Sequence, residues 1–186
     1  IRDVPGSSPN DPSAHGSGFD RVSAFSDGLF DGVHRCADYR DAPPIVTQEV
    51  FTSPDDAATG GNLSAEDLLP LLYLDLEDFY ATTFATTGRT WMPVDDIVLY
   101  DPETDDVSCG DFELSEEQAT NAIFYCVDEN VVIGDAMYLV TLGQEIGDFA
   151  IGTEIARQWA FAAQVQEGNL DNSVDTSLHA DCLTGL

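Results

Sequence analysis

The sequence contains no lysine and few basic residues of any kind. Its 186 residues include 35 aspartates and glutamates against 6 basic residues, all of them arginine, for a formal net charge of −29 at pH 7. Nucleic acids and anionic lipid surfaces are themselves negative and would repel such a chain, so we expect no nucleic acid among its partners. The charge favours a solvated surface, with attraction to a basic partner or to cations as the alternative.

Long hydrophobic runs are also missing. Without an apolar stretch of about 18 or more residues, the sequence predicts no membrane-spanning helix. No signal peptide is recognisable, and the sequence starts within a polar tract of glycine, serine, proline and aspartate. Hydrophobic residues nevertheless make up 43% of the chain, which is enough to form the core of one domain of ordinary size.

Cysteine is scarce, and none of the four cysteines has the short C-x-x-C spacing of zinc and redox sites. An even number without such motifs predicts two disulfides and an oxidising compartment, either extracellular or in the cell envelope. Cys109 and Cys126 flank a short loop and are the favoured pair, which by elimination leaves Cys36 to join Cys182. Four cysteines allow three pairings, and the sequence does not decide among them.

Three stretches of different composition divide the chain. Residues 1–20 are turn formers and small polar residues, which predict a flexible acidic linker or tail. Residues 21–62 are irregular and are broken by Pro43-Pro44 and Gly60-Gly61, so we expect an extended arm that wraps the domain. Residues 63–186 show regular hydrophobic periodicity and are predicted to form the folded domain.

The periodicity of this domain predicts an α+β fold. Ser64, followed three residues later by Asp67, resembles a helix start, and leucines and aromatic residues at helical spacing continue from it. Short β-type runs predict one strand and a hairpin-like pair, and the helical pattern then returns. Strands are expected at residues 96–101, 122–126 and 131–133, and helices at 64–85, 137–142, 148–166 and from about 173 onward.

Several segments of this domain resemble, in the same order, the motifs of one bacterial family. Residues 121–126 (NAIFYC) and 132–135 (VIGD) are similar to N-A-F-Y-C followed by I-A-W-D. Residues 147–151 (GDFAI) are similar to G-D-x-A-V, and residues 179–185 (HADCLTG) to Q-A-D-C-F-A-G. From about Leu68 onward, the chain thus resembles the neutral zinc metallopeptidase family, in its secreted actinobacterial branch.

The resemblance implies a zincin-like metallopeptidase domain with a small β region and a long former active-site helix, preceded here by the expected arm. Family members continue past the A-D-C segment with further helix, so we expect the domain to be incomplete at its C-terminus. The metal-binding motif of the family, L-A-H-E-W-G-H-A-V-Q, aligns without a gap with residues 155–164, IARQWAFAAQ. The tryptophan, both flanking alanine positions and the glutamine are kept.

The residues that carry the chemistry of this motif are all replaced. In the family, two histidines four residues apart bind zinc, and the glutamate after the first accepts a proton from zinc-bound water. Arg157 and Phe161 stand in place of the histidines, Gln158 in place of the glutamate, and Ser177 in place of a third ligand, also a glutamate. A guanidinium has no lone pair to donate, and a phenyl ring offers only a hydrophobic surface. We therefore expect no zinc, no other cofactor and no peptidase activity.

Asp181 matches an aspartate that, by the resemblance, orients a zinc-binding histidine. With Arg157 in the place of a histidine, we expect an Arg157–Asp181 ion pair that fills the vacated metal site. Removing one partner of such a buried pair is expected to cost about 3–5 kcal/mol. A separation of more than about 6 Å between the two groups would contradict this hypothesis.

The sequence leaves three functions open. The favoured one is a non-catalytic metallopeptidase-like protein that acts outside the cytoplasm as a binding or accessory subunit of a protein complex. A complex of the cell envelope is one concrete version, with tethering through residues that precede the given sequence. The first alternative is a metal-independent hydrolase that uses carboxylates such as Asp175 and Asp181, although no motif organises them. The second is an acidic secreted protein of unrelated fold.

Overall fold

Two compact units make up the chain, residues 1–62 and residues 63–186. The structure, a computed structural model, describes residues 15, 18–41, 53–59, 62–169 and 173–185. Between the two units lies the position at which the sequence becomes regularly periodic. In the described ranges, no helix is long and apolar enough to cross a membrane.

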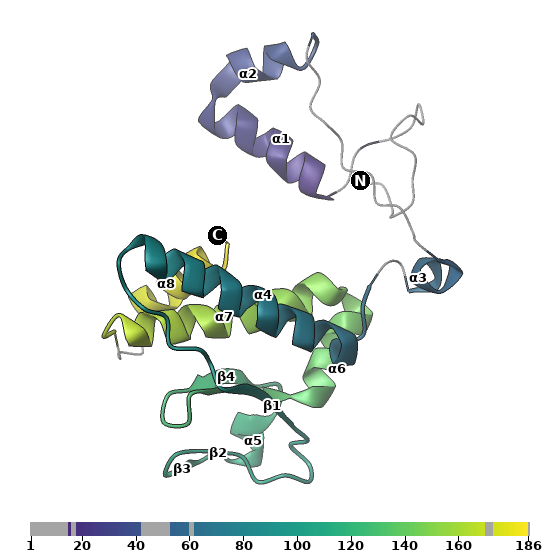
Figure 1. The fold of residues 1–186 in the computed structure, drawn as a ribbon. Helices are drawn as coiled ribbons and strands as arrows, with labels where there is room; N and C mark the ends of the chain where they lie inside the picture. Colours follow the sequence, from purple (N-terminus) through teal and green to yellow (C-terminus); the bar gives the residue numbers. More distant parts are fainter. Residues whose placement is uncertain (1–14, 16–17, 42–52, 60–61, 170–172, 186) are drawn as a thin grey trace. The chain divides into compact units, whose positions relative to one another are not determined.

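The first unit is helical where it is described (Figure 1). It contains α1 (Gly18–Phe30), α2 (Gly32–Asp38) and α3 (Pro54–Ala58). The expected extended arm over residues 21–62 is therefore wrong for these residues, and the last residues of the expected linker at 1–20 begin α1. The proline and glycine pairs that suggested an irregular arm lie outside the described residues.

Helices α1 and α2 contact each other through polar side chains and through a close approach of Cys36 to Gly28. The carboxylate of Asp27 accepts hydrogen bonds from Arg35 Nε at 3.0 Å and from the Tyr39 hydroxyl at 2.8 Å. The Arg35 guanidinium also lies 5.1 Å from the centre of the Tyr39 ring. At Gly28 an added Cβ would meet Cys36 Sγ at 3.3 Å, so the small residue permits the close approach.

In the second unit, the order of the helices and strands agrees with the expected α+β class, which is confirmed. The predicted first helix begins at Ser64, whose side chain accepts a hydrogen bond from the Asp67 backbone N–H. The elements are α4 (Ala65–Thr86), β1 (Asp96–Tyr100), β2 (Ser108–Cys109), β3 (Phe112–Glu113), α5 (Glu116–Ala119), β4 (Ile123–Cys126), β5 (Val131–Asp135), α6 (Ala136–Glu145), α7 (Asp148–Gln166) and α8 (Val174–Thr184).

The main sheet has the order β1-β5-β4, with β5 in the centre. β4 and β5 pair antiparallel as the expected hairpin, whereas β1 pairs parallel to β5 although more than thirty residues separate the starts of the two strands. β2 and β3 form a separate two-stranded ribbon. Figure 1 shows α4 and α7 side by side on one face of the main sheet, and α5 with the β2–β3 ribbon on the other side.

The larger hydrophobic core lies among α4, α6, α7 and the sheet. Helix α7 supplies its central residues, because Ile151, Ile155, Trp159 and Ala162 recur every three or four residues and are almost completely buried. A smaller core beneath the sheet contains Tyr100 and joins the ribbon and α5 to β4 and β5. The larger core thus fixes the position of α7, and α8 packs against α7.

Candidate functional site

Helix α7 carries three of the four replaced positions. Arg157 and Phe161 are half-buried and lie four residues apart, so they share one face of the helix. Gln158 turns toward the interior, and its side chain is 2% exposed. Ser177, the fourth position, is half-buried on α8, which packs against α7.

The Arg157 guanidinium contacts both an aromatic ring and a carboxylate. Its Nε donates a hydrogen bond to Asp181 Oδ1 on α8 at 2.6 Å. Its central carbon lies 5.0 Å from the centre of the Phe161 ring, the geometry of a cation–π contact. The expected Arg157–Asp181 ion pair is therefore present, and Arg157, Phe161 and Asp181 belong to one cluster of contacts.

The ion pair is more exposed to water than we expected. The side chain of Arg157 is 32% exposed and that of Asp181 is 55% exposed. On α8, Thr176 and Ala180 face the interior, so Asp181, the next residue along the helix, points toward the surface. The expected cost of about 3–5 kcal/mol for a buried pair is wrong here, since water-screened pairs stabilise a fold by about 0–1 kcal/mol.

The Gln158 side chain, which the resemblance aligned with a glutamate, is turned back onto its own helix. The Gln158 amide donates a hydrogen bond to the backbone carbonyl of Glu154, four residues earlier in α7, at 3.2 Å. An amide does not accept a proton near neutral pH, and this one is almost completely buried. Gln158 thus helps to pack α7 against the core.

The donor set of this cluster does not fit zinc. Zinc in proteins is held by imidazole, thiolate or carboxylate groups, whereas Arg157, Gln158, Phe161 and Ser177 offer none of these. Within the described ranges, no group of three or more histidine, cysteine, aspartate or glutamate side chains is arranged to hold a metal ion.

The two carboxylates considered for a metal-independent hydrolase are not brought together. Asp175 and Asp181 are both exposed on α8 and lie six residues apart, so they point to different sides of this helix. General acid–base chemistry requires both carboxylates to reach one substrate. This geometry gives the hydrolase alternative no support.

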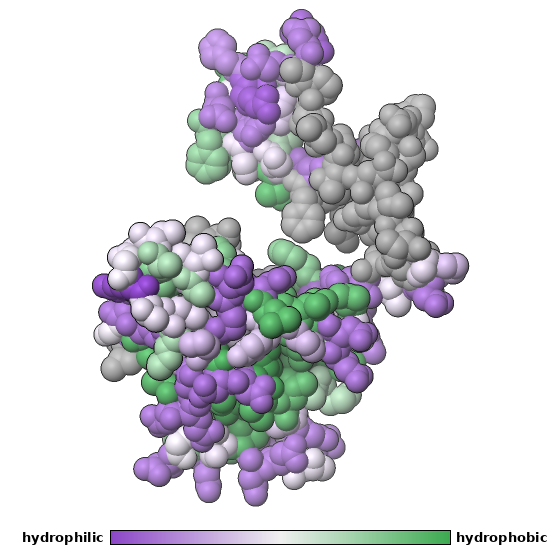
Figure 2. All heavy atoms as spheres, in the orientation of Figure 1, coloured by the Kyte–Doolittle hydropathy of each residue, from purple (hydrophilic) through white to green (hydrophobic). Residues whose placement is uncertain are grey.

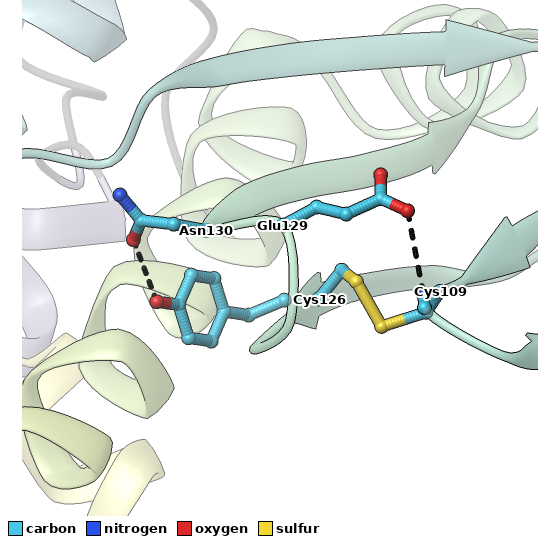
Figure 3. The surroundings of a disulfide bond; sticks show 6 residues. Cys109, Cys126, Glu129 and Asn130 are labelled. Atoms are coloured by element: carbon cyan, nitrogen blue, oxygen red, sulfur yellow. Dashed lines mark hydrogen bonds between the residues drawn. A yellow bond between two sulfur atoms is a disulfide. The ribbon is translucent and has the colours of Figure 1, made fainter.

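One of the two expected disulfides is present. Cys109 and Cys126 are bonded, which confirms this pair and joins β2 to β4 (Figure 3). Glu129, in the turn after β4, strengthens the junction because its carboxylate accepts a hydrogen bond from the Gly110 N–H at 3.3 Å. Among the described residues, the Cys109–Cys126 bond is the only covalent cross-link.

The second expected disulfide, between Cys36 and Cys182, is not formed in this structure and stays a prediction. Cys36 and Cys182 are both free, exposed thiols. They belong to different compact units, and pairing them by elimination assumed that every cysteine is used.

An apolar groove lies beside the Arg157–Asp181 pair, and we refer to it as the α4–α8 groove. Its volume is about 240 Å³. Apolar side chains from three helices line it: Leu72, Leu76, Phe79, Tyr80, Ala156 and Leu183. Two polar residues, Asp75 and Thr184, complete the lining. The sequence interpretation missed this groove, although α4 is apolar over more than one face and thereby signalled it.

Tyr80 forms one wall of the groove and also belongs to the core. Its ring is stacked on that of Trp91 with 5.0 Å between ring centres. Burial raises the pKa of Tyr80 to about 12, so the hydroxyl stays protonated at any physiological pH. The groove therefore has a single charged wall, which Asp75 provides.

No protein-family model matches this chain, and no curated protein or solved structure matches it either. The resemblance to the neutral zinc metallopeptidases therefore remains a prediction from the sequence motifs. The function has to be argued from the geometry of α4, α7 and α8.

Proposed function

We propose that this chain is a non-catalytic metallopeptidase-like protein with a zincin-like domain, which acts as a binding or structural subunit of a protein complex outside the cytoplasm. The observation that carries this proposal is the Arg157 cluster. Arg157 contacts Phe161 and Asp181, so the positions that would have to face a zinc ion are engaged with one another.

Electrostatics supports the absence of metal chemistry at this cluster. A permanent guanidinium cation at the place of a ligand repels a divalent cation, and it already neutralises Asp181. Gln158 is buried, so it does not reach a water molecule or a peptide bond at the surface. What the domain offers a partner is a rigid surface.

The Cys109–Cys126 disulfide supports the proposed compartment. The Cys109–Cys126 disulfide is of the kind that persists in oxidising surroundings and is rare in the cytosol. The high negative charge and lack of lysine suit a solvated protein of the extracellular space or the cell envelope. A protein complex of the cell envelope is the concrete setting that we propose.

Zinc analysis of the purified protein, combined with a peptide-hydrolysis assay, tests this proposal. We expect no stoichiometric zinc after incubation with zinc and dialysis, and no hydrolysis of a mixed peptide library. Stoichiometric zinc, or hydrolysis that Gln158→Ala abolishes, would contradict a non-catalytic role.

A restored variant tests the resemblance itself. In the combined variant Arg157→His, Gln158→Glu, Phe161→His and Ser177→Glu, the family's donor set returns on the same helices. We expect this variant to bind zinc and to gain thermal stability from it, because a ligand that binds only the folded state stabilises that state. Failure of a folded variant to bind zinc would favour the acidic secreted protein of unrelated fold.

A further inference from the structure

The α4–α8 groove is smaller than most small-molecule pockets and large enough for one side chain. Pockets that hold small molecules usually have volumes of about 300–1,000 Å³. The groove has about 240 Å³ and is lined almost entirely by apolar side chains. Its dimensions suit a single large apolar side chain projecting from another protein, as in the anchors by which a helix binds a groove.

The charges around the groove restrict what its partner can be. Residues 63–186 contain two arginines and most of the acidic residues of the chain. Both arginines are paired with carboxylates, Arg157 with Asp181 and Arg89 with Glu167. The groove itself has Asp75 in its wall and no basic side chain. A partner therefore has to bring its own positive charge.

We propose that the α4–α8 groove binds a basic amphipathic segment of a partner protein. One large apolar side chain of the segment fills the groove between α4 and α8, and a lysine or arginine beside it pairs with Asp75. This inference rests on the proposed function, because it names the class of partner that the non-catalytic domain binds. Charge complementarity makes the association fast and dependent on salt.

Cys182 provides a reporter at the groove. It is an exposed free thiol next to Leu183, which lines the groove. The full chain with Cys36→Ser is labelled at Cys182 with an environment-sensitive fluorophore. The probe is a synthetic helical peptide with leucines on one face and lysines on the other. The control peptide has the same composition in a scrambled order, so its charge is equal and its apolar face is lost.

We expect the label on Cys182 to respond to the amphipathic peptide and not to the scrambled one. Asp75→Arg is expected to weaken binding about tenfold, because it places a cation beside the peptide's cation. Ala156→Phe fills the groove and is expected to weaken binding at least as much. Glu103→Arg is the matched control: it makes the same charge change in the same unit, on the exposed loop after β1, and should alter affinity less than about twofold.

Several outcomes overturn the inference. Equal binding of both peptides, or equal effects of Asp75→Arg and Glu103→Arg, means that only the overall negative charge attracts the probe. Unchanged binding by folded Ala156→Phe means that the peptide lies elsewhere. A label signal that changes with protein concentration, without peptide, assigns the groove to a second copy of this chain.

The same experiment keeps the two proposals apart. After each titration, the peptide is examined by mass spectrometry. Cleavage of the peptide contradicts the non-catalytic function, whatever the affinity. Intact peptide without groove-dependent binding contradicts the groove inference and leaves the non-catalytic function standing.

Discussion

The carboxylate of Glu77 accepts three hydrogen bonds at the edge of the main core. Its Oε1 accepts hydrogen bonds from Trp159 Nε1 at 2.8 Å and from the Val94 N–H at 3.0 Å, and its Oε2 accepts one from Trp91 Nε1 at 2.7 Å. One carboxylate thus ties α4 to α7 and to the segment before β1. Because all three donors are N–H groups, a group with two accepting oxygens is required here.

Replacing Glu77 by Gln should therefore destabilise the fold although the shape is kept. The amide NH₂ would face one or two N–H donors, leaving them without an acceptor, and we expect a loss of about 1–3 kcal/mol. Urea unfolding followed by tryptophan fluorescence measures the change. The control is Asp78→Asn at the neighbouring exposed residue. Its free energy of unfolding is expected to stay within about 0.5 kcal/mol of the wild-type value. Equal effects of the two variants would show that the Glu77 network contributes nothing beyond its charge.

Among the elements, the ribbon β2–β3 depends most on covalent support. Each of its two strands has only two residues, and the ribbon is not paired with the main sheet. The Cys109–Cys126 bond attaches it to β4 across a sequence separation of 17 residues. A loop of this length predicts about 3 kcal/mol of stabilisation, because the bond restricts the unfolded chain.

Removal of the Cys109–Cys126 disulfide tests how much this bond stabilises the fold. We expect the double variant Cys109→Ala, Cys126→Ala to lose about 3 kcal/mol of unfolding free energy, and reduction of the wild type to cause a similar loss. The control is Cys36→Ser with Cys182→Ser, which should unfold like the wild type because both thiols are free and exposed. If this control is the less stable variant, the pairing of the four cysteines described above is incorrect.

Helices α1 and α2 were not predicted, although α1 has apolar residues at helical spacing. Within α1, Val22, Phe25 and Leu29 recur at helical spacing, and all three are more than 60% exposed. No residue of α2 is buried either. The helical pattern was therefore present in the sequence, but the proline and glycine pairs further along outweighed it in the prediction of an extended arm.

The chain carries far more acidic than basic residues, and hydrophilic side chains are spread over the face of the molecule that Figure 2 shows. On the visible face of the second unit, apolar side chains are bordered by hydrophilic ones. Burial raises the pKa of Tyr100 to about 12, with the Asp135 carboxylate as a second cause, and burial does the same for Tyr80.

Alkaline unfolding follows from these two tyrosines. The ordinary tyrosine pKa is 10.0, so above that pH the unfolded chain loses these protons while the folded chain keeps them until about pH 12. Their contribution is complete below pH 10 and is lost as pH rises through 12, by an amount on the order of 2 kcal/mol for each residue. Urea unfolding at a series of pH values measures it. In Tyr80→Phe, the free energy of unfolding should fall less steeply between pH 10 and pH 12 than in the wild type. The same steepness in both proteins would exclude Tyr80 as a cause.

By itself, the sequence determined the features that depend on short spacings. The Ser64 cap, the long apolar stripe of α7, the β4–β5 hairpin and the Cys109–Cys126 pair each depend on residues close together in the chain, where periodicity and turn chemistry act directly. The sequence also decided which side chains stand at positions 157, 158 and 161, and none of these three can bind zinc as imidazole, thiolate or carboxylate groups do.

Only the tertiary structure decided the features that depend on packing between distant segments. The parallel pairing of β1 with β5, the three donors around Glu77 and the α4–α8 groove join residues that no short pattern relates. The Arg157–Asp181 contact could be expected from the resemblance, but its exposure could not. Exposure depends on how far α8 turns each residue toward α7, and that rotation is set by the buried Thr176 and Ala180 rather than by the charged pair itself.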